Sequence, residues 1–297
     1  MSQFKTIGLI GRPGHAGVVD SLRRLLDYLP SRKVDIVLDE DTANLVPDHG
    51  QRKLCSREAL SKNCDLVIVV GGDGSMLNAA HIIASENVPV IGINRGRLGF
   101  LTDILPEEID RRIGEVLDGQ YTMDSRFLLD LEAVHQGGRQ HLGCALNDVV
   151  LHPGKAAQMI EFELFVDDRF VYSQESDGLI VATPTGSTAY AMSAGGPIMH
   201  PSLDAIVLLP MYPHSLSSRP IVVDGESEIR MVIAHKHDIE PQLSCDGEVV
   251  FTAVPGDEII VRKKATRLQL IHPLDHSFYQ ACRSKLGWGN RLVNKGE

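Results

Sequence analysis

The sequence is poor in the residues that build disulfides, thiolate metal sites and membrane spans. It has five cysteines, none of them in a CxxC pair: Cys55, Cys64, Cys144, Cys245 and Cys282. An odd number of dispersed cysteines predicts reduced thiols and argues against a disulfide framework or a zinc site. There is no run of 18 apolar residues and no signal-peptide pattern. We therefore expect a cytoplasmic protein that has no contact with a membrane.

Basic charge is also scarce. The 29 Lys and Arg are outnumbered by 39 Asp and Glu, which leaves a formal net charge of -10. This balance argues against non-specific binding to nucleic acid. An anionic substrate then has to be met by local basic groups or by a metal. The histidines show no ligand spacing: His235 and His237 straddle a polar turn, and the others are dispersed.

One stretch near the middle of the first half organises the chain. Residues 65–70 form a short valine-rich run, which predicts a buried strand of a parallel sheet. Gly71-Gly72-Asp73-Gly74 follows at once, and residues 75–84 have helical composition. A strand, a glycine turn and a helix in this order present backbone N–H groups at the carboxyl edge of a sheet, where they bind phosphate. The predicted phosphate loop is Gly71, Gly72, Gly74 and Ser75.

This loop differs from the familiar nucleotide loops. It matches neither GxxxxGK[ST] nor GxGxxG, and it has no lysine. A divalent cation is the usual replacement for that lysine. The loop also carries a carboxylate, Asp73, which an anion site tolerates when the carboxylate does chemistry or holds a metal. The alternative is a plain tight turn in which Asp73 caps the helix.

The first 120 or so residues alternate between strands and helices. Strand patterns cover 4–10, 34–38, 65–70 and 88–93, and helical patterns cover 16–29, 53–62, 75–84 and 106–117. Pro30 should end the first helix, and residues 39–50 read as a polar connection. This alternation predicts a doubly wound α/β domain.

The pattern changes near Tyr121. From Arg126 onward the segments are short and β-like, with turn residues between them. We predict an α/β nucleotide-binding domain over 1–124 and an all-β domain over 125–275. The tail, 276–297, is expected to pack back on the first domain.

Three polar stretches interrupt the β-like half. In the first, Asn147 can pair with an adenine edge, and Asp148 can accept hydrogen bonds from ribose hydroxyls. The alternative there is an Asx turn. The second, residues 176–178, contains Asp177, and taken alone its Asp-Gly pair favours a hairpin turn between strands. The third, residues 183–197, is dense in hydroxyls and glycines that suit a nucleotide's sugar and phosphate, with a flexible linker as the alternative.

Taken together, these motifs resemble the bacterial NAD kinase family. GGDG alone is shared with diacylglycerol-type lipid kinases and phosphofructokinases, whereas the ordered set across most of the chain is far more specific. The matching segments are 71–74, 92–100, 147–148, 176–178, 183–197, 210–215, 244–247 and 285–288.

The resemblance implies a function. The family phosphorylates the adenosine-ribose 2′-hydroxyl of NAD with ATP to make NADP, on an α/β domain joined to a β-sandwich domain. Asp73 would be the general base, and a divalent ion, with magnesium the first candidate, would bridge the ATP phosphates. We expect a homodimer or homotetramer. The implied NAD-binding residues are Asp73, Gly74, Asn147, Asp148, Asp177, Thr188, Ala189, Tyr190, Ala191, Met192 and Ser193.

Three further positions are peripheral members of this predicted site. Glu175 stands where a basic residue is common in the family, and Glu248 stands where an amide is common. Both add negative charge near an anionic ligand, and Gln158 is similarly peripheral. Two other functions stay open: a lipid or sugar kinase that uses the same loop, and a non-catalytic NAD-binding sensor.

Overall fold

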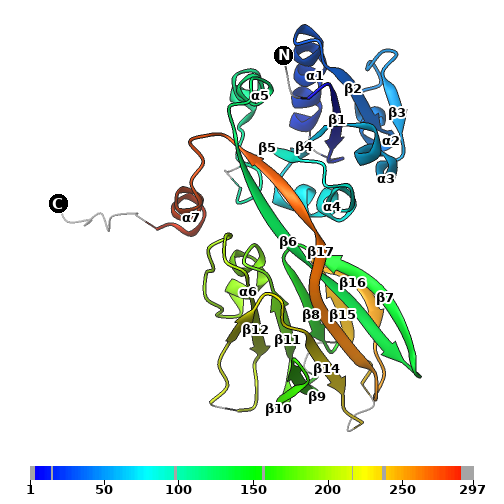
Figure 1. Ribbon diagram of the computed structural model, residues 1–297, viewed down its shortest axis with the longest axis vertical. Coiled ribbons are helices and arrows are strands. Elements are labelled where there is room, and N and C mark those ends of the chain that lie inside the picture. The colour runs from blue at the N-terminus through cyan, green and yellow to red at the C-terminus, as the bar shows by residue number, and fades with distance from the viewer. Residues whose placement is uncertain are drawn as a thin grey trace, which may run out of the picture. The chain divides into compact units, whose positions relative to one another are not determined.

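The computed structural model describes residues 4–14, 16–96, 99–155, 158–215, 217–235 and 239–288. His237 of the expected polar turn lies outside these residues. The chain divides into two compact units, Met1–Ser125 with Leu268–Glu297 and Arg126–Arg267 (Figure 1). We call them the α/β unit and the β unit. Each is described by itself.

The α/β unit is built on a parallel sheet in the strand order β5-β4-β1-β2-β3. Because β4 lies between β5 and β1, the carboxyl ends of these three strands meet at one sheet edge. The loops after them are therefore neighbours in space. The strands are β1 (Thr6–Gly11), β2 (Asp35–Asp39), β3 (Lys53–Cys55), β4 (Leu66–Gly71) and β5 (Val90–Asn94).

Helices cover both faces of this sheet. Apolar residues of α1 and α5 share one hydrophobic cluster with alternate residues of the strands, such as Leu9 and Ile68. The opposite face meets α3 and α4, since a side chain at Gly8 would touch Leu60 and one at Gly92 would touch Met76. The helices are α1 (Ala16–Ser31), α2 (Glu40–Leu45), α3 (Arg57–Leu60), α4 (Asp73–Ile83), α5 (Ile109–Leu117) and α7 (Phe278–Leu286). Short 3₁₀ turns cover Ser61–Asn63, Ala84–Glu86 and Pro106–Glu108.

Three local predictions in this unit are wrong. Helix α1 runs through Pro30 to Ser31. Proline has no N–H to donate to the Leu26 carbonyl, and Arg52 Nη2 donates to that carbonyl instead, at 2.8 Å. Residues 40–45 form α2 instead of a polar connection, and the Asp39 carboxylate caps it by accepting from the Thr42 N–H at 3.1 Å. The predicted helix over 53–62 begins as strand β3, which pairs with β2.

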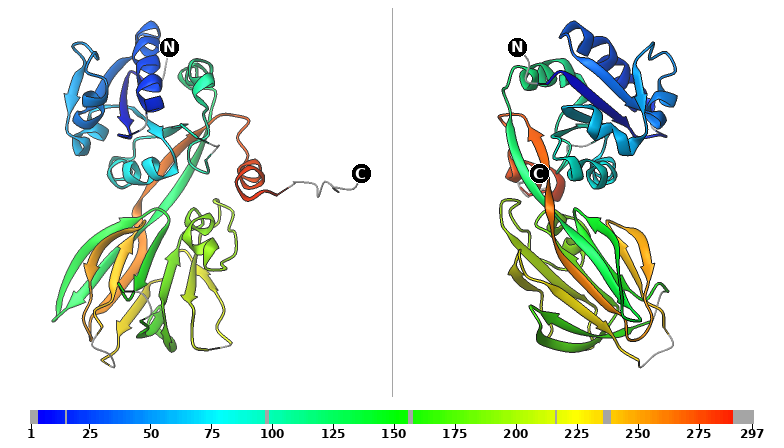
Figure 2. Two further views of the ribbon diagram at one scale, coloured as in Figure 1. Left: turned by 180° about the vertical axis from the view of Figure 1, so that it is seen from behind. Right: turned by 45° about the vertical axis from the view of Figure 1, so that its right-hand side comes forward.

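The β unit consists of two sheets that enclose one hydrophobic core (Figure 2). One sheet has the order β13-β12-β11-β8-β15-β16, and the other joins β10, β9, β14 and β17, with β6 paired to β17 and β7 paired to β6. Leu129 and Phe162 of one sheet share a cluster with Val149 and Leu179 of the other. This is a β-sandwich, so the predicted fold class, α/β plus all-β, is confirmed.

Along the chain the β unit runs from strand β6 to strand β17. The first strands are β6 (Thr122–His135), β7 (Gly138–Ala145), β8 (Asp148–His152), β9 (Ile160–Val166), β10 (Arg169–Ser176) and β11 (Gly178–Ala182). The later ones are β12 (Ala205–Met211), β13 (Ile221–Asp224), β14 (Ile229–Ile233), β15 (Gln242–Cys245), β16 (Glu248–Thr252) and β17 (Glu258–His272). The 3₁₀ turn η4 (Gly186–Thr188) and α6 (Tyr190–Ser193) lie between β11 and β12. None of the helices in the described part of the chain is long and apolar enough to span a bilayer.

Candidate functional site

The predicted strand, glycine turn and helix are present in the α/β unit. β4 ends at Gly71, Gly72 is the N-cap of α4, and Asp73 is the first helical residue. The Ser75 N–H donates to the Gly72 carbonyl at 2.9 Å. The first N–H groups of a helix in general lack intrahelical partners, and the helix dipole places partial positive charge there. Gly74 is exposed, whereas Ser75 is buried and its Oγ points back at Gly71, where an added Cβ would lie 2.1 Å away.

Asp73 does not cap this helix, so that alternative is wrong. Its Oδ1 accepts hydrogen bonds from the Leu101 N–H and the Thr102 hydroxyl, both at 3.0 Å. Its Oδ2 accepts one, from the Phe100 N–H at 2.9 Å. The loop after β5 therefore fixes the orientation of the carboxylate. Gly99 completes the fit, because an added Cβ there would lie 2.1 Å from Oδ1.

Cationic side chains that the sequence analysis missed surround this loop. A cavity of about 260 Å³ is lined by Gly71, Gly72 and Asp73 together with Arg12, Arg95 and Lys285. Arg12 follows β1 and Arg95 follows β5, so the strand order brings both beside the loop that follows β4. The missing lysine is thus replaced by groups from other loops. The two arginines could have been predicted, because each directly follows a strand of the predicted parallel sheet. Lys285 lies on α7, and no sequence pattern indicated that it would lie near the loop.

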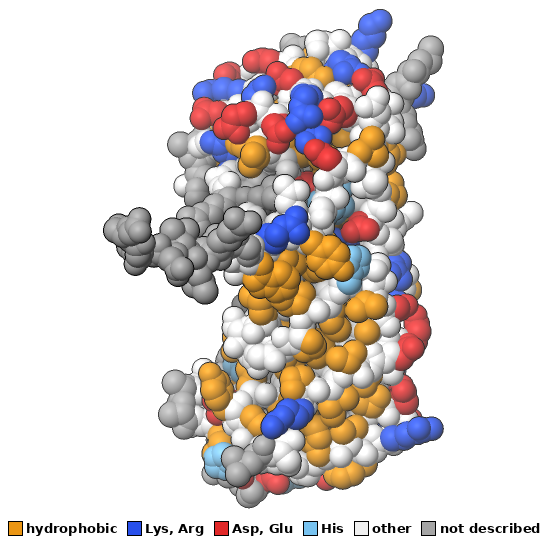
Figure 3. All heavy atoms as spheres, turned by 90° about the vertical axis from the view of Figure 1, so that its left-hand side faces the viewer, with side chains coloured by type: hydrophobic (Ala, Val, Ile, Leu, Met, Phe, Trp, Pro, Cys, Tyr) orange, Lys and Arg blue, Asp and Glu red, His pale blue; other side chains and the backbone are white. Residues whose placement is uncertain are grey.

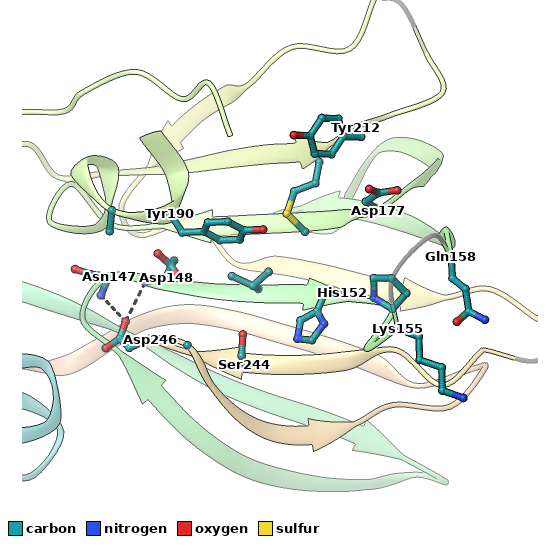
Figure 4. Close-up of a pocket in the computed structure, with 15 residues that line it drawn as sticks. Asn147, Asp148, His152, Lys155, Gln158, Asp177, Tyr190, Tyr212, Ser244 and Asp246 are labelled. Carbon is teal, nitrogen blue, oxygen red and sulfur yellow. Dashed lines mark hydrogen bonds between the residues drawn. The ribbon is translucent and has the colours of Figure 1, made fainter. Parts of the chain in front are cut away.

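A second cavity, of about 540 Å³, lies in the β unit (Figure 4). Figure 4 shows Asn147, Asp148 and Asp246 toward one end of it and Lys155 and Gln158 toward the other. Six of the predicted NAD-binding residues line it: Asn147, Asp148, Gln158, Asp177, Ala189 and Tyr190. Five polar lining residues were missed, namely His152, Lys155, Tyr212, Ser244 and Asp246.

The hydroxyl-rich stretch is ordered around this cavity, so it is not a flexible linker. Thr183 Oγ1 donates to the Leu146 carbonyl at 2.6 Å, and the Thr183 N–H donates to the Asn147 carbonyl at 2.9 Å. Gly186 lies so close that an added Cβ would be 2.1 Å from that Asn147 oxygen. The stretch therefore serves as the backing of residues 146–148 as well as a cavity wall.

Asp177 is not in a hairpin turn, because β10 and β11 belong to different sheets. Residue 177 is the single residue between them, and its N–H donates to the Met211 carbonyl at 2.9 Å. Gly178 has a φ of 141°, and an added Cβ would lie 2.0 Å from the Leu151 carbonyl oxygen. This crossing between sheets directs Asp177 to the cavity.

Other predicted residues are absent from the lining of this cavity. Ala191 is fully buried in the hydrophobic core, so its side chain packs there. The Thr188 hydroxyl donates to the Thr185 carbonyl at 3.2 Å. Ser193 lines a neighbouring cavity of about 550 Å³ that Tyr190 also borders. Met192, Glu175 and Glu248 line none of the cavities described above.

Burial shifts the pKa of two titratable groups that line the cavity of the β unit. Burial, together with the neighbouring carboxylate of Asp246, raises the pKa of Asp148 to about 7. Burial also lowers the pKa of His152. Asp148 therefore changes between a hydrogen-bond donor and an acceptor near neutral pH, while His152 favours its neutral form.

Comparison with known proteins agrees with this arrangement. The pattern of the ATP-NAD kinase N-terminal domain matches residues 7–121, and that of the ATP-NAD kinase C-terminal domain matches residues 146–273. NAD kinase of Azotobacter vinelandii is 61% identical over 292 residues, which covers 98% of this chain and 99% of the relative. NAD kinase of Pseudomonas fluorescens strain SBW25 is 58% identical over 297 residues, covering 100% of both.

Two solved structures share the fold at lower sequence identity. Yeast NADH kinase complexed with NADH has a TM-score of 0.90 at 24% identity and covers 98% of this chain and 90% of its own. The NAD kinase from Archaeoglobus fulgidus in complex with ATP has a TM-score of 0.70 at 24% identity and covers 95% and 96%. With the full-length relatives at about 60% identity, these findings show that the chain belongs to the NAD kinase family.

Proposed function

We propose that this chain transfers the terminal phosphate of ATP to the adenosine-ribose 2′-hydroxyl of NAD and so makes NADP. The observation that carries the proposal is the coincidence of family membership over the whole chain with a GGDG loop whose carboxylate is held in place. The complexes of the yeast relative with NADH and of the archaeal relative with ATP support the same pair of substrates.

Asp73 is the proposed general base, and its hydrogen bonds identify the oxygen that acts. A carboxylate oxygen has room for about two hydrogen bonds. Oδ1 already accepts two, whereas among the described residues Oδ2 accepts one, from Phe100. Oδ2 therefore retains the lone pair that would take the proton from the substrate hydroxyl as that oxygen attacks the terminal phosphorus of ATP.

The cavity around the GGDG loop is the proposed site for ATP phosphates. The helix N-terminus, Arg12, Arg95 and Lys285 supply positive charge there. Of the described residues that line it, Asp73 is the one carboxylate. This lining would leave a magnesium ion to be held chiefly by phosphate oxygens and water, because the remaining lone pair of Asp73 is the proposed proton acceptor. Such an ion would supply neutralisation of the phosphate charge.

The cavity of the β unit is the proposed NAD site. Asn147 offers an amide that can pair with the adenine edge, and Asp148 and Asp177 offer carboxyl groups for ribose hydroxyls. Tyr190 supplies an aromatic face, and the residue is 51% exposed. Thr188, Ala191 and Met192 then act as support for the wall rather than as direct contacts.

A self-associating protein is also proposed. Figure 3 shows hydrophobic side chains gathered over the β unit on the face drawn there, with few charged groups among them. Tyr212, beside the candidate cavity, is 82% exposed. Apolar surface of this kind supports a homodimer or homotetramer. Light scattering of the purified chain would give the mass, and a monomer at micromolar concentration would contradict the proposal.

One assay separates the proposed function from its two alternatives. The wild type is incubated with NAD, ATP and magnesium beside Asp73→Asn, and NADP is measured. We expect NADP from the wild type and a loss of about two or more orders of magnitude in kcat for the variant, with NAD still bound. Removal of divalent ions by EDTA should abolish activity, and magnesium should restore it.

The alternatives predict other results in the same assay. A lipid or sugar kinase would phosphorylate its own acceptor and leave NAD unchanged. A sensor would bind NAD and make no product under any donor. Either result would overturn the proposed function.

A further inference from the structure

Asp246 occupies a turn where an aspartate usually faces solvent. It is the first residue of the two-residue hairpin between β15 and β16, with a φ of 50°, and Gly247 follows with a φ of 87°. These positive values are those of a tight hairpin turn, which needs only small or turn-forming residues. The Asp246 carboxylate, however, points inward to residues 146–148 (Figure 4).

That carboxylate accepts from three consecutive backbone N–H groups. Oδ2 accepts from Leu146 at 2.8 Å, and Oδ1 accepts from Asn147 at 2.7 Å and from Asp148 at 3.1 Å. The Asp246 N–H in turn donates to the Asp148 carbonyl at 3.0 Å. Residues 146 and 147 connect β7 of one sheet with β8 of the other, and Asp148 is the first residue of β8, where it pairs with Ala182.

The segment is thus held from two sides. Thr183 binds the carbonyls of Leu146 and Asn147, and Asp246 binds the N–H groups. The side chains of Asn147 and Asp148 are left to line the cavity. Neither holding group belongs to the segment itself, and a charged acceptor makes stronger hydrogen bonds than a neutral one.

We propose that Asp246 is a positioning residue for nucleotide recognition: it fixes the backbone of residues 146–148 and thereby aims Asn147 and Asp148 into the cavity. This inference rests on the proposed function, since it assumes that the cavity receives NAD. Asp246 would act on Asn147 and Asp148 through hydrogen bonds to their backbone, without itself contacting the ligand.

The same contact has an electrostatic consequence that separates positioning from simple support. The Asp246 charge lies beside Asp148 and raises the pKa of its carboxyl group, in addition to the effect of burial. Burial raises the pKa of the adjoining Cys245 thiol to about 12, so it carries no charge at neutral pH. The other titratable groups that line the cavity are His152, Lys155, Asp177, Tyr190 and Tyr212. Removal of the Asp246 charge should therefore move the titration of Asp148 to lower pH.

The test uses the full-length chain with Asp246→Asn, Asp246→Ala and a matched control. Asp168→Asn is the control, because Asp168 lies in another hairpin with a φ of 60° and its side chain is 85% exposed. Steady-state kinetics give KM for NAD, KM for ATP and kcat between pH 5.5 and 9, and thermal melting reports the fold. NAD binding is measured separately by calorimetry.

We expect Asp246→Asn to raise KM for NAD by about tenfold, and Asp246→Ala by more, with KM for ATP within about twofold of wild type. The inflection of kcat/KM for NAD near neutral pH should shift downward in Asp246→Asn and stay in place in Asp168→Asn. Asp246→Asn is nearly isosteric, so it decides the matter if Asp246→Ala fails to fold.

Two results would overturn the inference. One is an unchanged KM for NAD in a folded Asp246→Asn; the other is an equal rise in both KM values without a shift of the pH inflection. If the wild type makes no NADP but binds NAD, the proposed function fails while calorimetry still tests Asp246. If the wild type is active and Asp246→Asn matches it, only this inference fails.

Discussion

At the scale of single residues, the orientation of Asp73 depends on a glycine that lies far from it in sequence. The carboxylate sits against Gly99 with no space for a side chain, and it is bonded to the three residues that follow. A general base works only when its oxygen is in reach of the proton it takes. The orientation of the proposed base is therefore set by residues 99–102 as much as by Asp73 itself.

Gly99→Ala tests this dependence. Its Cβ would lie 2.1 Å from Asp73 Oδ1 and 2.5 Å from Thr102 Oγ1, so the carboxylate has to turn. We expect kcat to fall by about tenfold or more, because misplacement of a reacting group by about 1 Å can cost a hundredfold. KM values should change little. Gly143→Ala is the control, since its nearest neighbour would be 3.8 Å away, and equal losses in both variants would contradict the argument.

At the scale of elements, the phosphate loop is completed by the loops on either side of it. The strand order β5-β4-β1 places Arg12 and Arg95 beside the helix N-terminus of α4. The Arg95 N–H also donates to the Gly71 carbonyl at 3.0 Å, which joins two of these loops. Guanidinium groups bind phosphate through charge-assisted hydrogen bonds, which are about twice as strong as neutral ones.

Arg12→Ala should weaken the binding of ATP. Arg12 is exposed, so its removal costs the fold little. We expect KM for ATP to rise by about tenfold, with KM for NAD nearly unchanged, in steady-state assays at fixed ionic strength. Arg23→Ala is a suitable comparison because that exposed arginine contacts Asp48 at 3.5 Å and lies outside the cavity lining. A similar rise in Arg23→Ala would point to the overall charge instead.

At the scale of the whole molecule, the net charge and the stability of the protein both conflict with the proposed binding of NAD in the β unit. The formal net charge is -10, yet the cavity proposed for an anionic dinucleotide contains the carboxyl groups of Asp148, Asp177 and Asp246. Burial and Asp246 raise the pKa of Asp148 to about 7. Between about pH 4 and 7, Asp148 is therefore protonated in the folded state. In the unfolded chain, where its pKa is about 3.9, it has released that proton.

Asp148→Asn should therefore stabilise the protein at high pH. A raised folded-state pKa means that the wild type loses stability as pH rises between about 4 and 7, and the penalty is complete above 7. A shift of this size amounts to roughly 4 kcal/mol at most. The variant should gain melting temperature over wild type at pH 8 and gain little at pH 4, while it binds NAD more weakly. The same gain at both pH values would show that the pKa of Asp148 is not raised in the folded protein.

Prediction from sequence succeeded for features that depend on residues close together in the chain. The alternation of elements, the change to successive strands after Tyr121 and the strand, glycine turn and helix around Asp73 all depend on neighbouring residues, although β6 and β17 are longer than the short strands expected. It failed at Pro30 and in the hairpin-turn alternative for residues 176–178. The partner of the Leu26 carbonyl is 26 positions away in sequence, and the strands on either side of Asp177 pair in different sheets.

The sequence by itself determined the class of fold, the strand, glycine turn and helix around Asp73, and the family. Hydrophobic period and glycine placement act over a few residues, and the ordered motifs identify the family along the whole chain. Only the tertiary structure decided which groups complete the sites. Arg12, Arg95, Gly99 and Asp246 act on residues that are distant in sequence. Strand order and the crossing between sheets bring them there, and no local pattern encodes either.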